Sequence, residues 1–321
     1  MRIGIVTPAP PGSRFGNRVT AMRWARILRS LGQRVNIFQE YQSGNLDLLI
    51  ALHARRSHQS LERFHRRHPE RPTIVALTGT DLYRDLRKSR SVRQSLELAT
   101  RIVALQPAAQ DELDAALQQK VRVIYQSAPK MPQRNHAGSL FSSKFFNVCV
   151  IGHLREVKDP FRAAMATRSL PPSSRIRVNQ VGGAMTDHMA ERARAEMKSN
   201  ARYRWLGELS RWRTRRIMSQ CQVCIVSSRM EGGANVLSEA VVAGTPVIAS
   251  RIPGNLGILG EGYPGYFRAG NTTELAQILI KAETDTAFLR HLKQNCKNLA
   301  PLFHPARERA DWESLLSELS Q

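Results

Sequence analysis

Residues 221–250, CQVCIVSSRMEGGANVLSEAVVAGTPVIAS, contain the repeating unit of a parallel sheet. A short apolar run at 223–226 predicts a buried strand, and a polar loop with two consecutive glycines follows it. Residues 234–243 have the composition of a helix, which a glycine and a proline end before a second apolar run at 247–249. This order of strand, loop, helix and strand predicts an α/β protein.

The loop before this helix has residues that suit a charged ligand with hydroxyl groups. Gly232 and Gly233 leave backbone N–H groups unobstructed at the positive end of a helix, which favours an anion such as phosphate. Glu231 and Glu239 stand at the two ends of the unit, and carboxylates accept hydrogen bonds from sugar hydroxyls. The alternative is that Glu239 is an ordinary surface residue and that the glycines only make a turn.

The string EGGANVLSEAVVAGTPVIAS at 231–250 resembles the E-x7-E segment of the retaining glycosyltransferases of family 4. The resemblance implies the GT-B architecture, in which two Rossmann-like domains face each other across a cleft. It also implies that Glu231 faces the donor sugar and that Glu239 binds the ribose of the donor. The residues it implies for the donor diphosphate in this segment are Gly232, Gly233, Ala234 and Asn235.

The bulk composition is that of a folded protein without a membrane span. A chain of 321 residues is long enough for two domains, and 42% apolar residues are enough for two cores. The first apolar run is too short for a secretory signal, and no run approaches the length of a membrane helix. Four cysteines do not make a disulfide framework, which predicts a reducing cytoplasm.

Cys221 and Cys224 have the spacing of a metal or redox pair. No second pair accompanies them, and Cys149 and Cys296 are distant in the sequence. Two residues three apart in a strand point to opposite faces, so we expect core cysteines.

The formal net charge of +22 comes mainly from scattered arginines. Anionic substrates, an acidic membrane surface and nucleic acid are the competing explanations. No nucleic-acid-binding motif is present, and a solvated basic surface that captures phosphate-bearing substrates is sufficient. A basic, non-catalytic nucleic-acid-binding protein remains the alternative of another class.

Residues 1–135 predict a Rossmann-like domain, with strands expected at 3–6, 35–38, 46–52, 73–77, 102–105 and 121–124 and a helix at 108–117. A loop rich in proline and glycine follows the first strand, and Asn17 is expected to cap the next helix. In the family that the chain resembles, this loop lies beneath the donor diphosphate and beside the acceptor. The resemblance therefore makes Gly16 and Asn17 donor-binding candidates, with Arg14 and Arg18 as anion partners.

Polar residues also follow two other predicted strands of this domain. His53, Arg55 and Arg56 come directly after one strand, and Thr80 and Asp81 follow the next. Because ligands bind outside the carboxyl ends of parallel strands, these residues predict an acceptor site, with His53 as a catalytic candidate. The alternatives are that the arginines start a solvated helix and that Thr80 or Asp81 caps one.

Residues 136–304 predict the second domain, after a polar linker at 130–143. In the family, an arginine and a lysine after its first strand neutralise the donor diphosphate. Lys158 matches the lysine, whereas His153 stands where the arginine is expected and Arg155 is the candidate replacement. Gly207 lies in a segment that resembles the one near the nucleotide base.

The resemblance places the last helix, 305–319, on the N-terminal domain and implies chemistry without a metal. No Asp-x-Asp triplet occurs in the chain, and cationic side chains and helix N-termini are expected to stabilise the leaving diphosphate. We therefore predict no metal and no cofactor besides the sugar nucleotide itself.

Three N-terminal strings, GNRVTAMRWARILRSLG at 16–32, ALHARRS at 51–57 and LTGTDLYRD at 77–85, resemble the selenosugar synthases of bacterial selenoneine biosynthesis. This resemblance implies UDP-N-acetylglucosamine or UDP-glucose as donor and selenophosphate as acceptor. A conventional hexosyltransferase acting on a saccharide or lipid remains an alternative. That alternative predicts an apolar amphipathic patch, for which 58–71 offers few apolar positions.

Overall fold

The computed structural model describes residues 1–130 and 140–320. The chain divides into two compact units. The first comprises residues 1–127, 231–233 and 304–321, and the second comprises 128–230 and 234–303. Most of the predicted linker at 130–143 lies outside the described residues.

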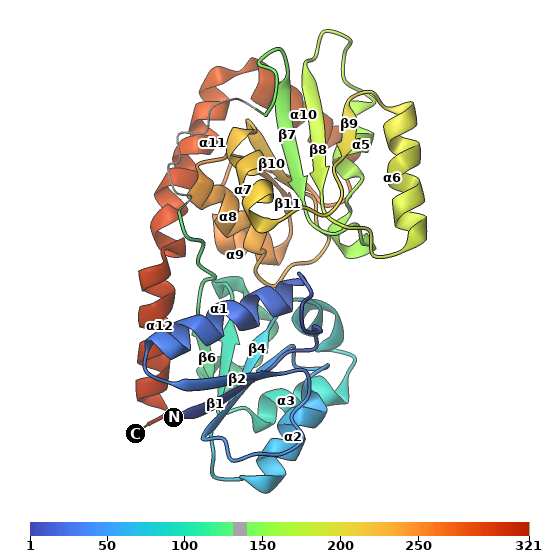
Figure 1. Ribbon diagram of the computed structural model, residues 1–321. Coiled ribbons are helices and arrows are strands. Elements are labelled where there is room, and N and C mark those ends of the chain that lie inside the picture. The colour runs from blue at the N-terminus through green and yellow to red at the C-terminus, as the bar shows by residue number, and fades with distance from the viewer. Residues whose placement is uncertain (131–139, 321) are drawn as a thin grey trace. The chain divides into compact units, whose positions relative to one another are not determined.

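The first unit contains a six-stranded parallel sheet in the order β2-β1-β3-β4-β5-β6 (Figure 1). All of its neighbouring strands pair in parallel. The strands are β1 (Arg2–Val6), β2 (Arg34–Phe38), β3 (Leu48–Leu52), β4 (Thr73–Leu77), β5 (Arg101–Ala104) and β6 (Val121–Val123). They confirm the six strands predicted for this part of the chain.

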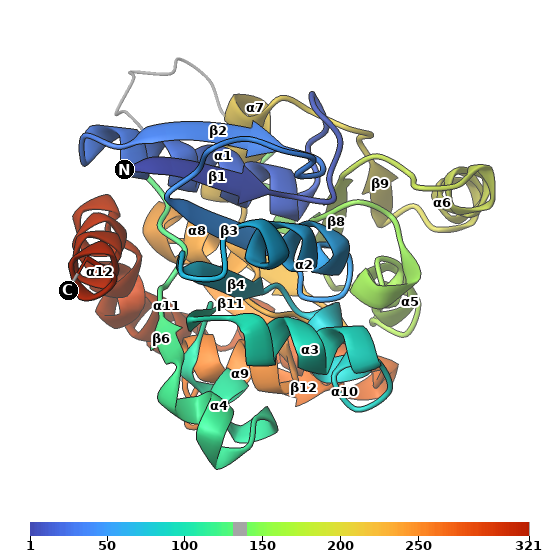
Figure 2. The same cartoon turned by 90° about the horizontal axis from the view of Figure 1, so that it is seen from below.

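Two hydrophobic cores lie on the two faces of this sheet, because alternate residues of each strand point to opposite sides. One core contains Ile3 and Ile5 together with side chains from α1 (Gly16–Ser30) and α12 (Pro305–Glu318). The other core contains residues of α2 (His58–Arg67) and α3 (Arg90–Leu98). Figure 2 shows α2 and α3 together against the sheet. Both faces are therefore covered, as a parallel sheet requires.

Two local predictions for this unit were wrong. The helix expected at 108–117 is a 3₁₀ segment, Pro107–Glu112, followed by a short helix, α4 (Ala115–Gln119). Asp114 separates them because its side chain accepts the Leu117 N–H and so starts a new helix. Helix α1 begins at Gly16 with Phe15 as its N-cap, so Asn17 is inside the helix and is not its cap.

A buried carboxylate fixes α12 to the first unit. Glu308 is 1% exposed and accepts hydrogen bonds from Arg23 Nε at 3.1 Å and from Trp24 Nε1 at 2.8 Å. Its other oxygen accepts from the backbone N–H of Ser127 at 2.9 Å. The Trp24 and Trp312 rings pack edge to face, with centroids 4.9 Å apart. Polar and apolar contacts thus join segments that are nearly 300 residues apart in the chain.

The second unit contains another six-stranded parallel sheet, in the order β12-β11-β10-β7-β8-β9. Its strands are β7 (Phe146–Ile151), β8 (Ile176–Val181), β9 (Tyr203–Trp205), β10 (Val223–Val226), β11 (Val247–Arg251) and β12 (Tyr266–Arg268). The two strands predicted within residues 221–250 are confirmed as β10 and β11, which pair in parallel.

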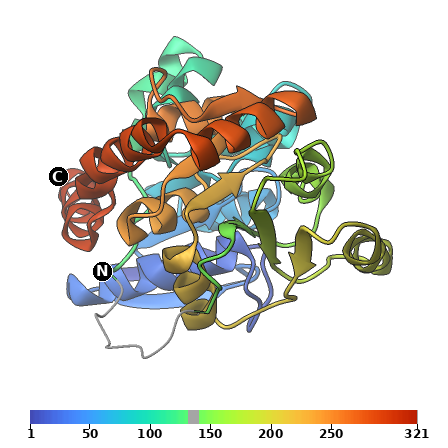
Figure 3. The same cartoon turned by 90° about the horizontal axis from the view of Figure 1, so that it is seen from above.

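Helices connect most of the strands of this sheet, because parallel strands need long crossover connections. Helix α6 runs beside β9 at the margin of the unit, as Figure 3 shows. Helix α8 ends, as predicted, at Gly244, which has φ +73° and therefore the left-handed conformation of a glycine C-cap. The helices are α5 (Arg162–Thr167), α6 (Asp187–Ser199), α7 (Arg211–Gln220), α8 (Asn235–Ala243), α9 (Pro253–Leu259), α10 (Thr272–Thr284) and α11 (Thr286–Leu299).

The cysteines are free and buried, as expected for core residues. The expectation that Cys221 and Cys224 point to opposite faces of one strand does not hold, because Cys221 precedes β10 and only Cys224 lies within it. The hydrogen bond with Cys221, together with burial, raises the pKa of the Cys149 thiol well above its usual range. Burial also raises the pKa of the Cys224 thiol, so Cys149 and Cys224 are neutral thiols.

None of the helices within residues 1–130 and 140–320 has the length and apolar composition needed to cross a membrane.

We expect Glu308→Ala to lower the free energy of unfolding by about 3 to 5 kcal/mol, because it removes the buried carboxylate that Arg23 and Trp24 contact. Urea unfolding followed by tryptophan fluorescence measures this loss. The matched control is Glu313→Ala on the same helix, which breaks only the exposed Arg309–Glu313 pair and should cost less than about 1 kcal/mol. Equal losses in the two variants would contradict a special role for Glu308.

Candidate active site

The strand order of the second sheet creates a point where two loops diverge. Strands β7 and β10 are neighbours, but β7 continues to β8 and β10 continues to β11 on its other side. The loops that follow them, 152–161 and 227–234, therefore leave the carboxyl edge in opposite directions. In open parallel sheets this divergence is where ligands bind.

These two loops are hydrogen-bonded to each other. The Ser227 hydroxyl lies within hydrogen-bond distance of the backbone oxygens of Lys158 and Asp159, at 3.1 and 2.9 Å. The backbone N–H of Arg229 donates to Val157 O at 2.8 Å. Asp159 has a left-handed backbone, φ +44°, and its carboxylate accepts from Arg162 Nε at 2.9 Å. The predicted leaving-group residue Lys158 is thus part of a fixed loop.

The loops after β8 and β9 pack closely against the loop after β7. Gly182 donates its N–H to Gly207 O at 2.8 Å, and the Gln180 side chain donates to Gly152 O at 3.2 Å. Gly182 has φ +147°, and a Cβ atom there would lie 2.0 Å from Gly152 O. Only glycine fits this position. The predicted donor-binding residue Gly207 is therefore held next to the loop that carries His153, whereas Arg155 is exposed.

Glu239 is not the ordinary surface residue of the alternative interpretation. Its side chain is only 15% exposed, and Arg211 Nη2 lies 3.0 Å from its Oε1. Sequence reasoning missed Arg211, which is one of several arginines in an unremarkable basic string, RWRTRR. A ligand hydroxyl bound by Glu239 would share this carboxylate with Arg211.

Helix α8 has an N-terminus suited to an anion. Its N-cap, Ala234, has no side chain that caps the helix, and its first turn contains no acidic residue. The positive end of the helix dipole is therefore not neutralised by the helix itself. Asn235 is the first residue of this helix, and the predicted sugar-facing Glu231 is buried in the preceding loop with Gly232 and Gly233.

The first unit has a comparable divergence of loops between β1 and β3, which are neighbours in its sheet. The loop after β1 leads into α1, whose first turn has no acidic residue. Arg14 is exposed and Arg18 is half-buried, and both lie close to this helix start in the sequence. Gly16 and Asn17 form the first turn of α1, so their backbone N–H groups belong to its positive end.

His53, at the end of β3, has an unusual backbone conformation. Its φ is +73°, a value that is uncommon for residues other than glycine, although asparagine, aspartate and histidine adopt it more often than the rest. The side chain is buried, and its Nε2 lies 3.0 Å from the hydroxyl of Thr80 at the end of β4. Burial lowers the pKa of His53 despite the nearby carboxylates of Asp81 and Asp85, so the ring is neutral near pH 7.

Asp81 is fully buried, and its carboxylate is occupied by backbone groups. It accepts hydrogen bonds from the N–H groups of Ala54 at 2.9 Å, Thr78 at 3.0 Å and Gly79 at 2.8 Å. Asp81 is the first residue of a π-helical segment, Asp81–Asp85. Thr80 occupies the N-cap position of this segment, but its side chain makes no capping hydrogen bond. The Asp81 carboxylate joins the ends of β3 and β4.

Arg55 and Arg56, which follow His53, do not start a helix. Helix α2 begins at His58, and the side chains of both arginines are exposed. Arg55 Nη1 lies 3.4 Å from the carboxylate of Asp85. Two exposed arginine side chains therefore lie on the loop that directly follows His53.

Within the described parts of the chain, no group of three or more histidine, cysteine, aspartate or glutamate side chains is arranged to hold a metal ion. The candidate site consists of cations, carboxylates, hydroxyls and backbone amides.

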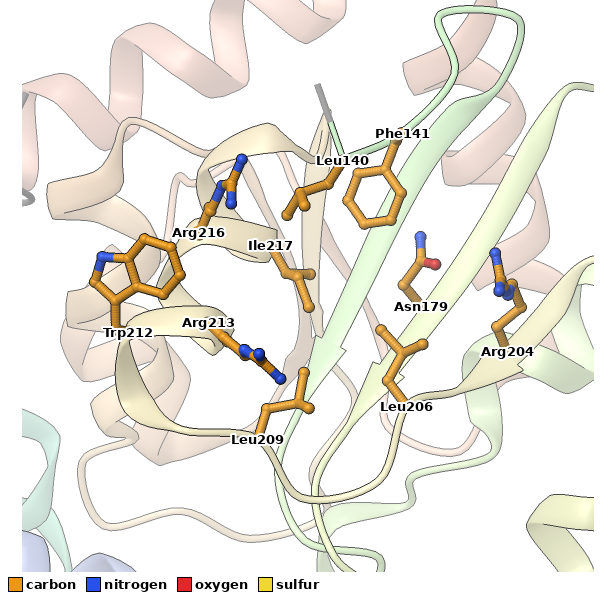
Figure 4. A pocket seen from close by; sticks show the side chains of 10 residues that line it. All are labelled: Leu140, Phe141, Asn179, Arg204, Leu206, Leu209, Trp212, Arg213, Arg216 and Ile217. Atoms are coloured by element: carbon orange, nitrogen blue, oxygen red, sulfur yellow. The ribbon is translucent and has the colours of Figure 1, made fainter. Parts of the chain in front are cut away.

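A hollow of about 500 Å³ in the second unit was not predicted from the sequence (Figure 4). Apolar side chains and three arginines line it, and no residue predicted to bind donor or acceptor is among them. Its lining residues are Leu140, Phe141, Asn179, Arg204, Leu206, Leu209, Trp212, Arg213, Arg216 and Ile217. We assign it no part in the reaction.

Comparison with known proteins identifies the family. The sequence profile described as glycosyl transferases group 1 matches residues 133–299, which is more than half of the chain. The chain belongs to this family. It is a glycosyltransferase, and family membership favours an enzyme over the nucleic-acid-binding alternative.

Solved structures show that this glycosyltransferase has the GT-B fold, as predicted. HepE from Anabaena in complex with UDP-glucose is 17% identical, with a TM-score of 0.78 over 99% of this chain and 100% of HepE. Sucrose-phosphate synthase from Thermosynechococcus elongatus is 16% identical, with a TM-score of 0.79 over 99% and 98% of the two chains. A glycosyltransferase from Rickettsia africae is 12% identical, with a TM-score of 0.74 over 100% and 98%.

We expect His53→Asn to flatten the pH dependence of the glycosyltransferase's stability below pH 6.5. Because burial holds the pKa of His53 below its ordinary value of 6.5, the unfolded chain binds the proton more tightly than the folded chain. The wild-type free energy of unfolding should therefore fall as the pH drops from 6.5 towards about 5, before the carboxylates titrate. Asparagine tolerates the positive φ.

Urea unfolding at several pH values between about 5 and 7.5 measures this effect. The control is His291→Asn, which replaces an exposed histidine on α11. If the stability of His53→Asn and of the wild type depended on pH in the same way, the lowered pKa of His53 would not be the cause of the loss of stability at low pH.

Proposed function

We propose that this glycosyltransferase transfers a hexose from a UDP-sugar, UDP-N-acetylglucosamine or UDP-glucose, to selenophosphate and so forms a selenium–carbon bond. The selenium lone pair attacks the anomeric carbon while the carbon–oxygen bond to UDP breaks, and the electron pair leaves with UDP. Hydrolysis of the phosphorus–selenium bond then gives inorganic phosphate and a selenosugar for selenoneine biosynthesis.

The donor half of the proposal is supported by the loops of the second unit. Lys158 lies on a loop fixed by Ser227, and helix α8, which begins shortly after Ser227 in the chain, has no acidic residue in its first turn to neutralise its positive end. Such groups stabilise a leaving diphosphate. Arg155 and His153 are on the same loop as Lys158. HepE, which has the same fold, binds UDP-glucose.

The acceptor half rests on one observation in the first unit, the exposed side chains of Arg55 and Arg56 on the loop that follows the buried His53, whose ring is hydrogen-bonded to Thr80. This arrangement suits a small anion better than a neutral saccharide. Selenophosphate is already an anionic, soft nucleophile, so it needs positioning by cations rather than a strong base. The N-terminal strings that resemble selenosugar synthases contain all four of these residues.

The free, buried cysteines are consistent with the reducing cytoplasm that we infer for this enzyme. A reduced selenium acceptor also requires such a compartment, since selenophosphate is readily oxidised.

We expect the purified protein to release UDP from UDP-N-acetylglucosamine or UDP-glucose only when selenophosphate is present. Coupled detection of UDP and mass spectrometry of the sugar measure this, and the product should carry the selenium isotope pattern. UDP release that is independent of selenophosphate would favour the conventional hexosyltransferase with a saccharide or lipid acceptor. No turnover with any UDP-sugar would contradict both functions.

Lys158→Met should lower kcat by about 10²- to 10³-fold, because it removes a cation that stabilises the leaving diphosphate. The matched control is Lys198→Met on α6, an exposed lysine of the same unit, which should leave kcat unchanged. If both variants retained wild-type kcat, Lys158 would have no part in the leaving-group step.

A further inference from the structure

The His53–Thr80 pair is built at some energetic cost. A left-handed backbone conformation at a residue other than glycine costs roughly 1 to 2 kcal/mol, and His53 has φ +73°. The π-helical segment Asp81–Asp85 begins directly after Thr80, and such segments are common at functional sites. Retained strain at the carboxyl edge of a parallel sheet indicates a functional role for this pair.

The hydrogen bonds of His53 define which ring nitrogen carries its proton. The backbone N–H of Arg56 points at His53 Nδ1 at a distance of 3.4 Å, so Nδ1 accepts. In the neutral ring the proton is then on Nε2, which faces the Thr80 hydroxyl at 3.0 Å. His53 therefore donates to Thr80, and the Thr80 O–H is left to donate to another group. Thr80 is half-exposed, so a ligand can accept this bond.

Asp81 fixes the distance between the two partners. Its carboxylate binds the N–H of Ala54, next to His53, and the N–H groups of Thr78 and Gly79, next to Thr80. It lies 3.9 Å from His53 Nδ1, too far for a good hydrogen bond to the ring. The role that the geometry gives Asp81 is thus to hold the backbone of both loops, and not to bind the acceptor itself.

We propose that the Thr80 hydroxyl donates a hydrogen bond to a phosphoryl oxygen of the anionic acceptor, and that His53 and Asp81 are the positioning residues that aim this hydroxyl. The inference rests on the proposed function for the identity of the acceptor. It changes the predicted role of His53 from a catalytic residue to a positioning residue, and that of Asp81 from acceptor binding to positioning.

The charges around the pair favour an anion. Asp81 and Asp85 face His53 from the segment after β4, and Arg56 faces it from its own loop. Both carboxylates are engaged, Asp81 by backbone N–H groups and Asp85 by Arg55 and Arg84. The exposed charged groups of the loop that follows His53 are the guanidinium groups of Arg55 and Arg56. A hydroxyl donor together with guanidinium groups on the neighbouring strand-end loop suits the oxygens of a phosphoryl group.

The test compares Thr80→Val, which keeps the shape and removes the hydroxyl, with Thr80→Ser, which restores the hydroxyl. We expect Thr80→Val to raise the KM for selenophosphate about tenfold and to leave the KM for the UDP-sugar unchanged. Thr80→Ser should return the KM for selenophosphate to near the wild-type value.

A double-mutant cycle separates orientation from an independent role of His53. If His53 acts through Thr80, His53→Asn should raise the same KM, and the His53→Asn/Thr80→Val double variant should be no worse than Thr80→Val alone. Because burial lowers the pKa of His53 below 6.5, titration of its ring should not change the wild-type KM for selenophosphate between about pH 7.5 and 8.5. Additive effects in the cycle would overturn the positioning role.

Binding of inorganic thiophosphate, measured by calorimetry, tests the inference without turnover. Wild-type protein should bind thiophosphate about tenfold more tightly than Thr80→Val. Equal affinities, absent wild-type binding, or an increase in the UDP-sugar KM of Thr80→Val would overturn the inference. Failure of selenophosphate turnover with this tenfold difference intact would instead count against the proposed function and leave the anion site in place.

Discussion

The loops at the carboxyl ends of parallel strands have backbone N–H and C=O groups that the sheet does not pair. The candidate functional residues are held in place by the side chains that hydrogen-bond to these groups. Buried N–H and C=O groups are almost always paired. In the first unit the Asp81 carboxylate takes three N–H groups from the loops after β3 and β4. In the second unit the Ser227 hydroxyl lies within hydrogen-bond distance of backbone oxygens of the loop after β7. Each loop is thereby fixed before any substrate binds.

This constraint also explains why glycine and strained residues gather at the same edges. Gly182 allows the loops after β7, β8 and β9 to approach to contact distance, where a side chain would collide with Gly152. His53 and Asp159 adopt left-handed conformations that their surroundings hold in place. Loops held this tightly place cations and hydroxyls at fixed positions, which is what stabilisation of a transferred charge requires.

Some of the arginines that give the chain its large positive charge have structural roles and do not simply form a solvated basic surface. Arg202 donates to the backbone oxygens of Pro171 and Ser174, and Arg63 donates to that of Tyr41. Arg101 and Arg122 both pair with Glu318 on α12. Part of the arginine content therefore closes loops and attaches a helix, while Arg55 and Arg56 remain exposed beside a strand end.

Local sequence patterns were enough to predict the α/β class, the strands and the loops that carry Lys158, Glu231 and Thr80. These features follow from local patterns, because apolar runs and glycines specify strands and turns within a few residues. The sequence did not determine the break at Asp114, the Arg211–Glu239 pair, the contact of both Cys221 and Cys224 with Cys149, or the role of Asp81. Those depend on which segments the strand order brings together, and partners 27 or 28 residues apart leave no periodic signal in the sequence.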